Sequence, residues 1–325
     1  MTYTPTAGFD GTDSFTYTVR TAQGESATNV VTVTVLPADG LVLRGTLSIV
    51  TPIDVPQDQR VYTRVTGIND AGQMVGIRDC GDDVCGFRLP PVPADFGVSR
   101  PAPQGINNVG QIVGSFGNRD CNIIPVLTDG FLLDTTTNTF TPLNFPGASS
   151  AGCPPGNVSF PSGINDAGQI VGTLGGHGFL RDAGTFIMID VPGAISTAAN
   201  GINNRGQIVG AFQDASGVSH GFLQDGGTFL TLDVPGAVST VANGINNGSK
   251  IVGTFQDASG VANGVFHGFL WDAGTFTTFD IPESISTMAN GINNRGQIVG
   301  SFLIPQPPPD TGVLTRGYVA TPASQ

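Results

Sequence analysis

The chain carries very little basic charge. It has one lysine, Lys250, and 13 Lys plus Arg stand against 25 Asp plus Glu, so the net charge is −12 over 325 residues. A surface of this sign repels phosphate backbones, which excludes nucleic acid as an expected partner. No apolar run approaches the roughly 18 residues that a membrane-spanning helix needs, so we expect no membrane span.

Helical periodicity is also lacking. No long stretch shows a convincing 3.6-residue apolar period. The 47 Gly and 23 Pro would interrupt helices, and Thr and Ser are abundant. The sequence therefore predicts an all-β fold built from many short strands.

Cysteine is scarce and does not occur in Cys-x-x-Cys pairs. The four cysteines are Cys80, Cys85, Cys121 and Cys153. An even number of cysteines, mostly in loop-like sequence, favours an oxidising compartment and two disulfides. The alternative is four free thiols in a cytosolic protein. The first ten residues lack the basic and apolar regions of a signal peptide, so we interpret the chain as mature or as an excerpt of a longer secreted or cell-surface protein.

A tripeptide repeat organises most of the chain. Gly-Ile-Asn begins six times, at Gly67, Gly105, Gly163, Gly201, Gly244 and Gly291. The intervals range from 38 to 58 residues, which suits one four-stranded propeller blade per repeat.

One repeat can be divided into strands. Residues 197–203 form the predicted inner strand, and residues 206–212, 220–225 and 228–235 form the next three. Asn203 and Gly206 occupy the first and fourth positions of a type I turn with a bulged glycine. Pro235 should end the outer strand because it cannot donate a ladder hydrogen bond. Small inner-strand residues suit a crowded axis, and the runs "QIVG" and "GFL" suit blades that pack on both faces.

The two ends of the chain complete each other. After the sixth Gly-Ile-Asn, only a second strand (296–302) and a third (316–321) follow. The missing fourth strand is predicted at residues 45–56, whose "GT…DVP" frame copies the outer strands of other repeats. This N-terminal strand should close a six-bladed β-propeller and remove open sheet edges.

The repeat resembles a known family. The frames "GIN..GQIVG" and "HGFL" are similar to bacterial extracellular repeats called HAF, over roughly residues 45–320. The match is strong in the last three units and looser where "CGFRL" and "DGFLL" replace "HGFL". The strand order is kelch-like, although most kelch glycine, Tyr and Trp positions are absent. The HAF resemblance implies secretion and repetition and supplies no catalytic residues.

Residues 1–38 form a second region, distinct from the propeller at residues 39–325. Two strands alternate strictly, with one side marked by Phe15, Tyr17, Val19, Val31, Val33 and Val35. The wording "GFDGTDSFTYTV" looks like the closing half of bacterial immunoglobulin-like or cadherin-like modules, without the opening strands.

So few strands cannot bury a core by themselves. This arm either packs on the propeller, follows absent upstream sequence, or is completed by another chain. We favour the last, in which strand addition builds a homo-oligomer or filament.

Patterns typical of catalysis and of cofactor binding are absent. We find no G-x-S-x-G, P-loop or dinucleotide fingerprint and expect no cofactor. The histidines, His177, His220 and His267, recur in the "HGF" frame. We interpret them as structural residues that hydrogen-bond a neighbouring loop, and as zinc ligands they would lie on different blades. Turn aspartates should mainly accept backbone hydrogen bonds; these are Asp70, Asp166, Asp182, Asp225 and Asp272.

Two copies of "FQDASGV" contain oxygen-rich loops. Asp214 and Ser216 lie in one copy, and Asp257 and Ser259 in the other. Calcium is a weak alternative for these loops, because no D-x-D-x-D spacing occurs. We therefore predict no metal site.

The loops that do not repeat are candidates for binding. We predict disulfides Cys80–Cys85 and Cys121–Cys153, which would staple loops on one propeller face. With residues 303–315, these loops form the least repetitive part of the chain. Asn157 and Asn247 lie in glycosylation sequons, which often occur by chance.

These features favour a non-enzymatic secreted or surface protein, with the propeller as a spacer and the arm as the means of assembly. The alternative is a carbohydrate- or protein-binding propeller that uses the stapled face. A hydrolase is the third reading, disfavoured because paired carboxylates and a metal cluster are missing.

Overall fold

The structure is a computed structural model, and it describes residues 11–20, 26–35, 47–53, 62–80, 84–90, 96, 100–117, 127–143, 159–258, 265–306 and 312–322. All regular elements in this part of the chain are strands, which confirms the all-β prediction. No described helix is long and apolar enough to cross a membrane. The chain divides into two units, Met1–Leu43 and Arg44–Gln325. The sequence places this boundary after residue 38.

The first unit contains one antiparallel hairpin. Strand β1 (Gly11–Arg20) pairs with β2 (Ser26–Val35) in an unbroken register from Gly11 opposite Val35 to Arg20 opposite Ser26. The two strands form a two-stranded sheet. The side chains of the arm residues predicted above lie outside the described part of the structure.

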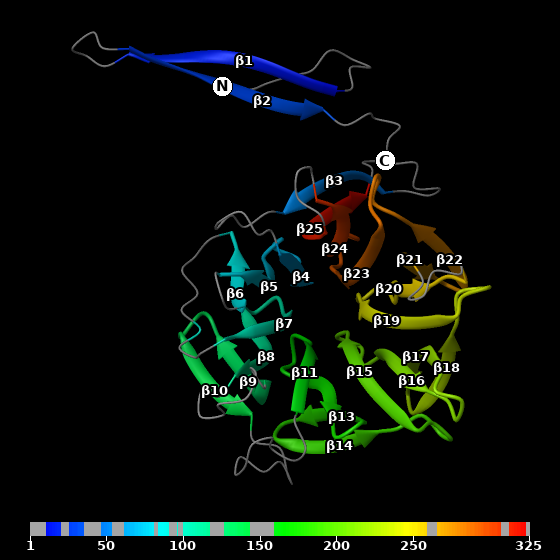
Figure 1. Cartoon of the computed structure of the whole chain (residues 1–325). Helices are drawn as coiled ribbons and strands as arrows, with labels where there is room; N and C mark the ends of the chain where they lie inside the picture. The colour runs from blue at the N-terminus through cyan, green and yellow to red at the C-terminus, as the bar shows by residue number, and fades with distance from the viewer. Residues whose placement is uncertain are drawn as a thin grey trace. The chain divides into compact units, whose positions relative to one another are not determined.

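The second unit is a six-bladed β-propeller (Figure 1). We number its sheets as blades 1–6 along the chain. The inner strands are β4 (Thr63–Ile68), β7 (Ala102–Ile106), β11 (Ser159–Ile164), β15 (Ser196–Ile202), β19 (Ser239–Ile245) and β23 (Ser286–Ile292). The second strands are β5 (Met74–Asp79), β8 (Gln111–Gly117), β12 (Ile170–Leu174), β16 (Ile208–Gln213), β20 (Ile251–Gln256) and β24 (Ile298–Pro305).

The outer half of each blade follows the same order. The third strands are β6 (Val84–Leu89), β9 (Leu127–Asp134), β13 (His177–Asp182), β17 (Ser219–Asp225), β21 (Phe266–Asp272) and β25 (Val313–Pro322). The outermost strands are β10 (Thr139–Leu143), β14 (Thr185–Ile189), β18 (Thr228–Leu232) and β22 (Thr275–Phe279).

Blades 1 and 6 depart from the simple repeat. In blade 6 the outermost strand is β3 (Leu47–Ile53), which pairs antiparallel with β25. Blade 1 has three strands among the described residues, β4, β5 and β6, rather than the four that the repeat predicts.

The predicted turn and strand ends can be checked in blade 4. Gly206 donates its backbone N–H to the Asn203 carbonyl over 3.1 Å and has a φ of 77°, as the predicted bulged turn requires. The outer strand β18 ends at Leu232, so the prediction that Pro235 ends it is wrong. The chain leaves the ladder earlier, because Val234 donates its backbone N–H to the Thr240 hydroxyl over 3.1 Å.

Apolar residues from consecutive positions enter opposite interfaces between blades. Ile208 packs with Val171 and Ile189 of blade 3, whereas Val209 packs with Ala242 and Ile251 of blade 5. In the same way, Phe222 packs at the interface with blade 3 and Leu223 at the interface with blade 5. The sequence expectation for "QIVG" and "GFL" is confirmed, and the core is a ring of interfaces between blades.

Crowding at the axis explains the glycines of the inner strands. A Cβ on Gly201 would lie 3.0 Å from the Asn243 carbonyl oxygen and 3.3 Å from the Gly244 Cα of the next blade. Neighbouring inner strands therefore meet backbone to backbone.

Antiparallel order gives the propeller two faces. The second strands end and the third strands begin at one face, where the outermost strands also end, and we call it the loop face. The turns between first and second strands lie on the other face, with those between third and fourth strands, and we call it the turn face.

Candidate functional site

Three histidines lie on the loop face, at the start of the third strands of blades 3, 4 and 5. Each faces an aspartate from the crossing segment that follows the outer strand of its own blade. The three pairs are His177–Asp190, His220–Asp233 and His267–Asp280, joined through Nδ1 over 3.0, 2.9 and 2.9 Å. The prediction that these histidines hydrogen-bond a loop is confirmed.

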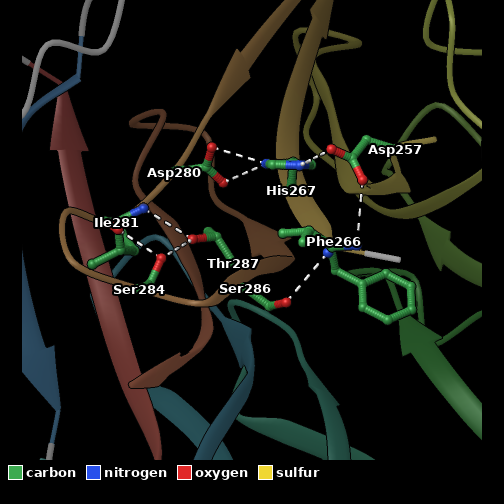
Figure 2. A network of polar contacts seen from close by, with 9 residues as sticks. Asp257, Phe266, His267, Asp280, Ile281, Ser284, Ser286 and Thr287 are labelled. Carbon is green, nitrogen blue, oxygen red and sulfur yellow. Dashed lines mark hydrogen bonds and ion pairs between the residues drawn. The ribbon is translucent and has the colours of Figure 1, made fainter. Parts of the chain in front are cut away.

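Blades 4 and 5 add a second carboxylate to the pair. His220 Nε2 lies 3.4 Å from Asp214, which belongs to the β16–β17 loop. His267 Nε2 lies 3.3 Å from Asp257, which follows β20. Figure 2 shows His267 between Asp257 and Asp280. We call His220 with Asp214 and Asp233 the blade-4 clamp, and His267 with Asp257 and Asp280 the blade-5 clamp.

Blade 3 lacks the second carboxylate because its chain takes a shorter path. Strands β12 and β13 are joined by Gly175 and Gly176 alone, both at positive φ. The side chain of His177 is 57% exposed, against 25% for His220 and 21% for His267. The same frame thus produces one open pair and two clamps.

Local hydrogen bonds hold the Asp214 carboxylate in place. Its Oδ1 accepts from the backbone and hydroxyl of Ser216 over 2.9 and 2.7 Å, and from the backbone of Val218 over 2.9 Å. The Ser216 hydroxyl and the Val218 amide lower the pKa of Asp214 to about 2. Asp214 is therefore a loop organiser that also faces the imidazole.

The imidazole of His220 is tuned toward its charged form. The hydrogen bond to Asp233 raises its pKa above the usual value; burial opposes this, and the bond to Asp214 adds to the rise. The ring also stacks on Phe212, with centroids 5.2 Å apart. His267 stacks on Phe255 in the same way, at 5.0 Å.

A cavity of about 230 Å³ adjoins the blade-4 clamp. Val218, His220, Asp233 and Val238 line it, together with the crossing segment as far as Thr240. Val238 is 49% exposed, and its counterparts Ile195 and Ile285 in the neighbouring segments are 62% and 43% exposed. The site therefore combines hydrogen-bonding groups with an exposed aliphatic wall.

The clamp geometry disfavours catalysis by these histidines. A histidine that acts as a general base needs a ring nitrogen free to accept a proton from substrate. In both clamps the two ring nitrogens face carboxylates, and no serine or cysteine takes either place. The described residues contain no cluster of three His, Cys, Asp or Glu side chains able to hold a metal ion.

The turn face has a different arrangement, which the sequence reasoning missed. The Asn of each Gly-Ile-Asn donates its Nδ2 to the backbone carbonyl of its counterpart in the next blade. Six such bonds, each 3.0 or 3.1 Å long, form a closed ring through Asn69, Asn107, Asn165, Asn203, Asn246 and Asn293.

A second ring lies next to it. It is formed by the residue that follows each Gly-Ile-Asn, whose backbone N–H donates to the side chain of its counterpart in the next blade over 2.7–2.9 Å. The six residues are Asp70, Asn108, Asp166, Asn204, Asn247 and Asn294. The two rings and the isoleucines beneath them line an axial cavity of about 70 Å³. Because each hydrogen bond joins two blades, we assign this cavity to stability. The recurring Asn-Asn or Asn-Asp pair after Gly-Ile was the available sign of these rings.

The predicted turn aspartates have other partners than expected. Asp70 and Asp166 accept backbone hydrogen bonds from neighbouring blades rather than from their own turns. Burial opposes ionisation of Asp166, but hydrogen bonds from Asn108 and Asn204 outweigh it and lower its pKa. Asp182 and Asp225 accept from the side chains of Gln169 and Gln207, and Asp272 pairs with Lys250 over 2.8 Å.

One predicted disulfide is present. Cys80 and Cys85 are joined by an S–S bond of 2.03 Å and staple the β5–β6 loop. Cys121 and Cys153 lie outside the described residues, as do Ser259, Asn157 and part of the 303–315 loop, so their roles stay predictions. Asn247 belongs to the second axial ring, where its side chain accepts from Asn204 over 2.9 Å.

Comparison with known proteins gives one sequence match and several structural ones. A family model described as a bacterial Ig domain matches residues 1–34. No curated protein matches the chain.

Two solved structures match the chain over most of its length. One is a mutant Aleuria aurantia lectin in complex with Fucα1-6GlcNAc, with a TM-score of 0.41 and 11% identity, covering 81% of this chain and 96% of the lectin. The other is a mutant of AofleA from Arthrobotrys oligospora, with a TM-score of 0.35 and 8% identity, covering 94% of this chain and 86% of that one.

Proposed function

We propose that the propeller is a non-enzymatic, multivalent carbohydrate-binding module of a secreted or cell-surface protein. Its sites are the histidine–aspartate pairs on the loop face of blades 3, 4 and 5. The observation that carries this proposal is the repetition of one polar pair beside exposed aliphatic residues in three successive blades.

The chemistry of the site suits a sugar ring. A sugar presents hydroxyls that donate and accept, and C–H faces that pack on apolar side chains. Asp233 accepts from His220 through Oδ2, which leaves its other oxygen for a ligand hydroxyl. Val218 and Val238 supply the apolar contact. At about 230 Å³ the cavity is smaller than drug-sized sites, which begin near ~300 Å³, so one sugar unit is the expected occupant.

Repetition compensates for shallow sites. Each pair is partly exposed and would bind one sugar weakly. Three sites on one rigid face engage a branched or repetitive glycan together, and linked binding raises overall affinity without new contacts. The Cys80–Cys85 disulfide and the match to a bacterial Ig domain support an extracellular location.

A glycan array probed with the full chain, followed by calorimetry on the glycans bound, tests this proposal. We expect the triple variant His177→Ala, His220→Ala, His267→Ala to lose at least about ten-fold in affinity. The matched control, Arg205→Ala with Arg295→Ala, changes two turn-face arginines and should bind normally. Thermal unfolding checks that both variants fold. Absence of binding to any glycan, or equal binding by the triple variant, would overturn the proposal.

A second candidate function is assembly through the arm. Strands β1 and β2 form a two-stranded sheet over the described residues, and such a hairpin is marginal alone. Strand addition from another copy would complete it and build a homo-oligomer or filament, with the propeller as spacer. We also propose that the repeats are of the HAF type, with a kelch-like strand order.

Light scattering at increasing protein concentration tests the second candidate. We expect association by the full chain and a monomer after deletion of residues 1–38. A full chain that stays monomeric at all concentrations would refute the idea, independently of any glycan binding.

A further inference from the structure

The clamps of blades 4 and 5 bring two carboxylates to one imidazole. In the blade-4 clamp, Nδ1 lies 2.9 Å from Asp233 and Nε2 lies 3.4 Å from Asp214. Both carboxylates are acceptors only, so each contact needs a proton on the facing nitrogen. An imidazolium carries two N–H groups and satisfies both, whereas a neutral imidazole carries one and leaves the other contact without a proton.

We propose that the blade-4 clamp is a proton-dependent latch, which fixes the β16–β17 loop when His220 is protonated and releases it when His220 is neutral. The consequence for the site rests on the proposed function: sugar binding in blade 4 strengthens on acidification, while blade 3 binds independently of the latch. One protein would thus hold a pH-dependent site and a constant one.

The longer contact identifies which side opens. A neutral His220 keeps its single proton on the shorter bond, toward Asp233, and the Asp214 contact is lost. Asp214 still holds Ser216 and Val218, so the loop detaches from the imidazole as a unit. Val218 and Ser219 form part of the cavity wall. Release of the loop therefore removes one wall of the sugar site.

The charged groups that face His220 are these two carboxylates. Strand β16 contributes the Phe212 ring and the loop after it contributes Asp214, while the segment after β18 contributes Asp233. Ser239 and Thr240 of β19 line the same cavity and are uncharged. Both carboxylates of the blade-4 clamp raise the pKa of His220, so the latch operates above the range of a free histidine.

Hydrogen exchange of the ligand-free protein tests the latch without reference to sugar. We compare the amides of residues 214–218 between about pH 5.5 and pH 8.5, corrected for intrinsic rates, and follow the three histidines by NMR. Protection of the loop should fall about five-fold above the His220 titration, as expected for loss of one charge-assisted contact of about 1 kcal/mol. The Gly175–Gly176 turn of blade 3 is the internal reference and should not change.

The variant Asp214→Asn separates protonation from simple loop loss. Its amide oxygen can still accept from Ser216 and Val218, and its NH₂ can donate to a neutral Nε2. The loop should then stay protected at high pH. Loop protection that is independent of pH in the wild type, or that falls equally in Asp214→Asn, overturns the latch.

Calorimetry with a bound glycan at the two pH values gives the second readout. Tighter binding at low pH in the wild type, and a loss of this difference in the variant Asp214→Asn, supports the proposal. Equal affinity at both pH values despite a responsive loop overturns the link to binding. If no glycan binds at either pH, the proposed function fails, and the exchange data alone decide whether the latch exists.

Discussion

One tyrosine, Tyr318, places a hydroxyl group in a buried position. The other blades place phenylalanine at the third-strand position that Tyr318 occupies in blade 6: Phe87, Phe131, Phe179, Phe222 and Phe269. The Tyr318 side chain is 0% exposed, and its hydroxyl has no hydrogen-bond partner among the described residues. Burial raises the pKa of this phenol far above its usual range.

Tyr318→Phe should therefore stabilise the protein. Removing an unsatisfied buried hydroxyl is expected to raise the free energy of unfolding by about 1 kcal/mol, measured by chemical denaturation. The reverse change, Phe222→Tyr, is the control and should lower it. A loss of stability on Tyr318→Phe would show that the hydroxyl has a partner, such as a buried water.

The axial rings make a second residue-scale prediction. Asn203 is 3% exposed, and its side chain forms four hydrogen bonds: Nδ2 donates to Asn246 and Gln207, and Oδ1 accepts from Arg205 and Gln207. Asn203→Ala leaves these buried groups unpaired and should cost about 3 kcal/mol or more. Asn247→Asp is the matched control, because blades 1 and 3 already carry Asp70 and Asp166 at the equivalent place. Equal losses in the free energy of unfolding would show that the ring through Asn203 contributes no more to stability than the second ring.

At the scale of elements, the loop that follows β16 depends on one carboxylate. The Ser216 hydroxyl and Val218 amide hold the pKa of Asp214 at about 2, below its ordinary value of 3.8. A carboxyl group whose pKa is lower in the folded than in the unfolded protein stabilises the folded loop at pH values above the unfolded pKa. This stabilisation is lost as the pH falls through the folded pKa. The loop should thus stay ordered down to about pH 4 and loosen toward pH 2. Carboxylate chemical shifts of Asp214 measure this, and a midpoint near 4 would contradict it.

Strand order and strand limits were largely readable from the repeated sequence, for a physical reason. Each repeat has the same turn residues at the same offsets, and the apolar pairs Ile208–Val209 and Phe222–Leu223 divide between two interfaces as their sequence predicts. The end of β18 was misplaced because the sequence does not show that Val234 bonds to Thr240 across the crossing segment. A contact between two repeats produces little recognisable pattern in the sequence of either repeat.

The candidate site was readable only in part, for the same reason. Recurrence identified the histidines, but their second carboxylates, Asp214 and Asp257, come from loops whose path the sequence does not fix. The arm and the Cys121–Cys153 pair stay predictions.

At the scale of the whole molecule, blade 6 is assembled from both ends of the propeller unit. Strand β3 pairs with β25 from Ile53 opposite Gly317 to Leu47 opposite Pro322, while β23, β24 and β25 pack against β4 of blade 1. The axial rings cross the same junction, since Asn293 donates to the Asn69 carbonyl over 3.0 Å. Removing the strand would expose the edge of β25 and take away the strand through which the chain passes from blade 6 to β4 of blade 1.

Deletion of residues 45–56 should abolish the cooperative unfolding of the propeller. Closure makes every blade depend on two neighbours, so an opened ring loses the single transition that a closed ring is expected to show. Calorimetry and intrinsic fluorescence measure the transition. Deletion of residues 1–38, which removes only the arm, is the control and should leave it in place. A sharp transition at an unchanged midpoint without residues 45–56 would mean that the ring does not need β3.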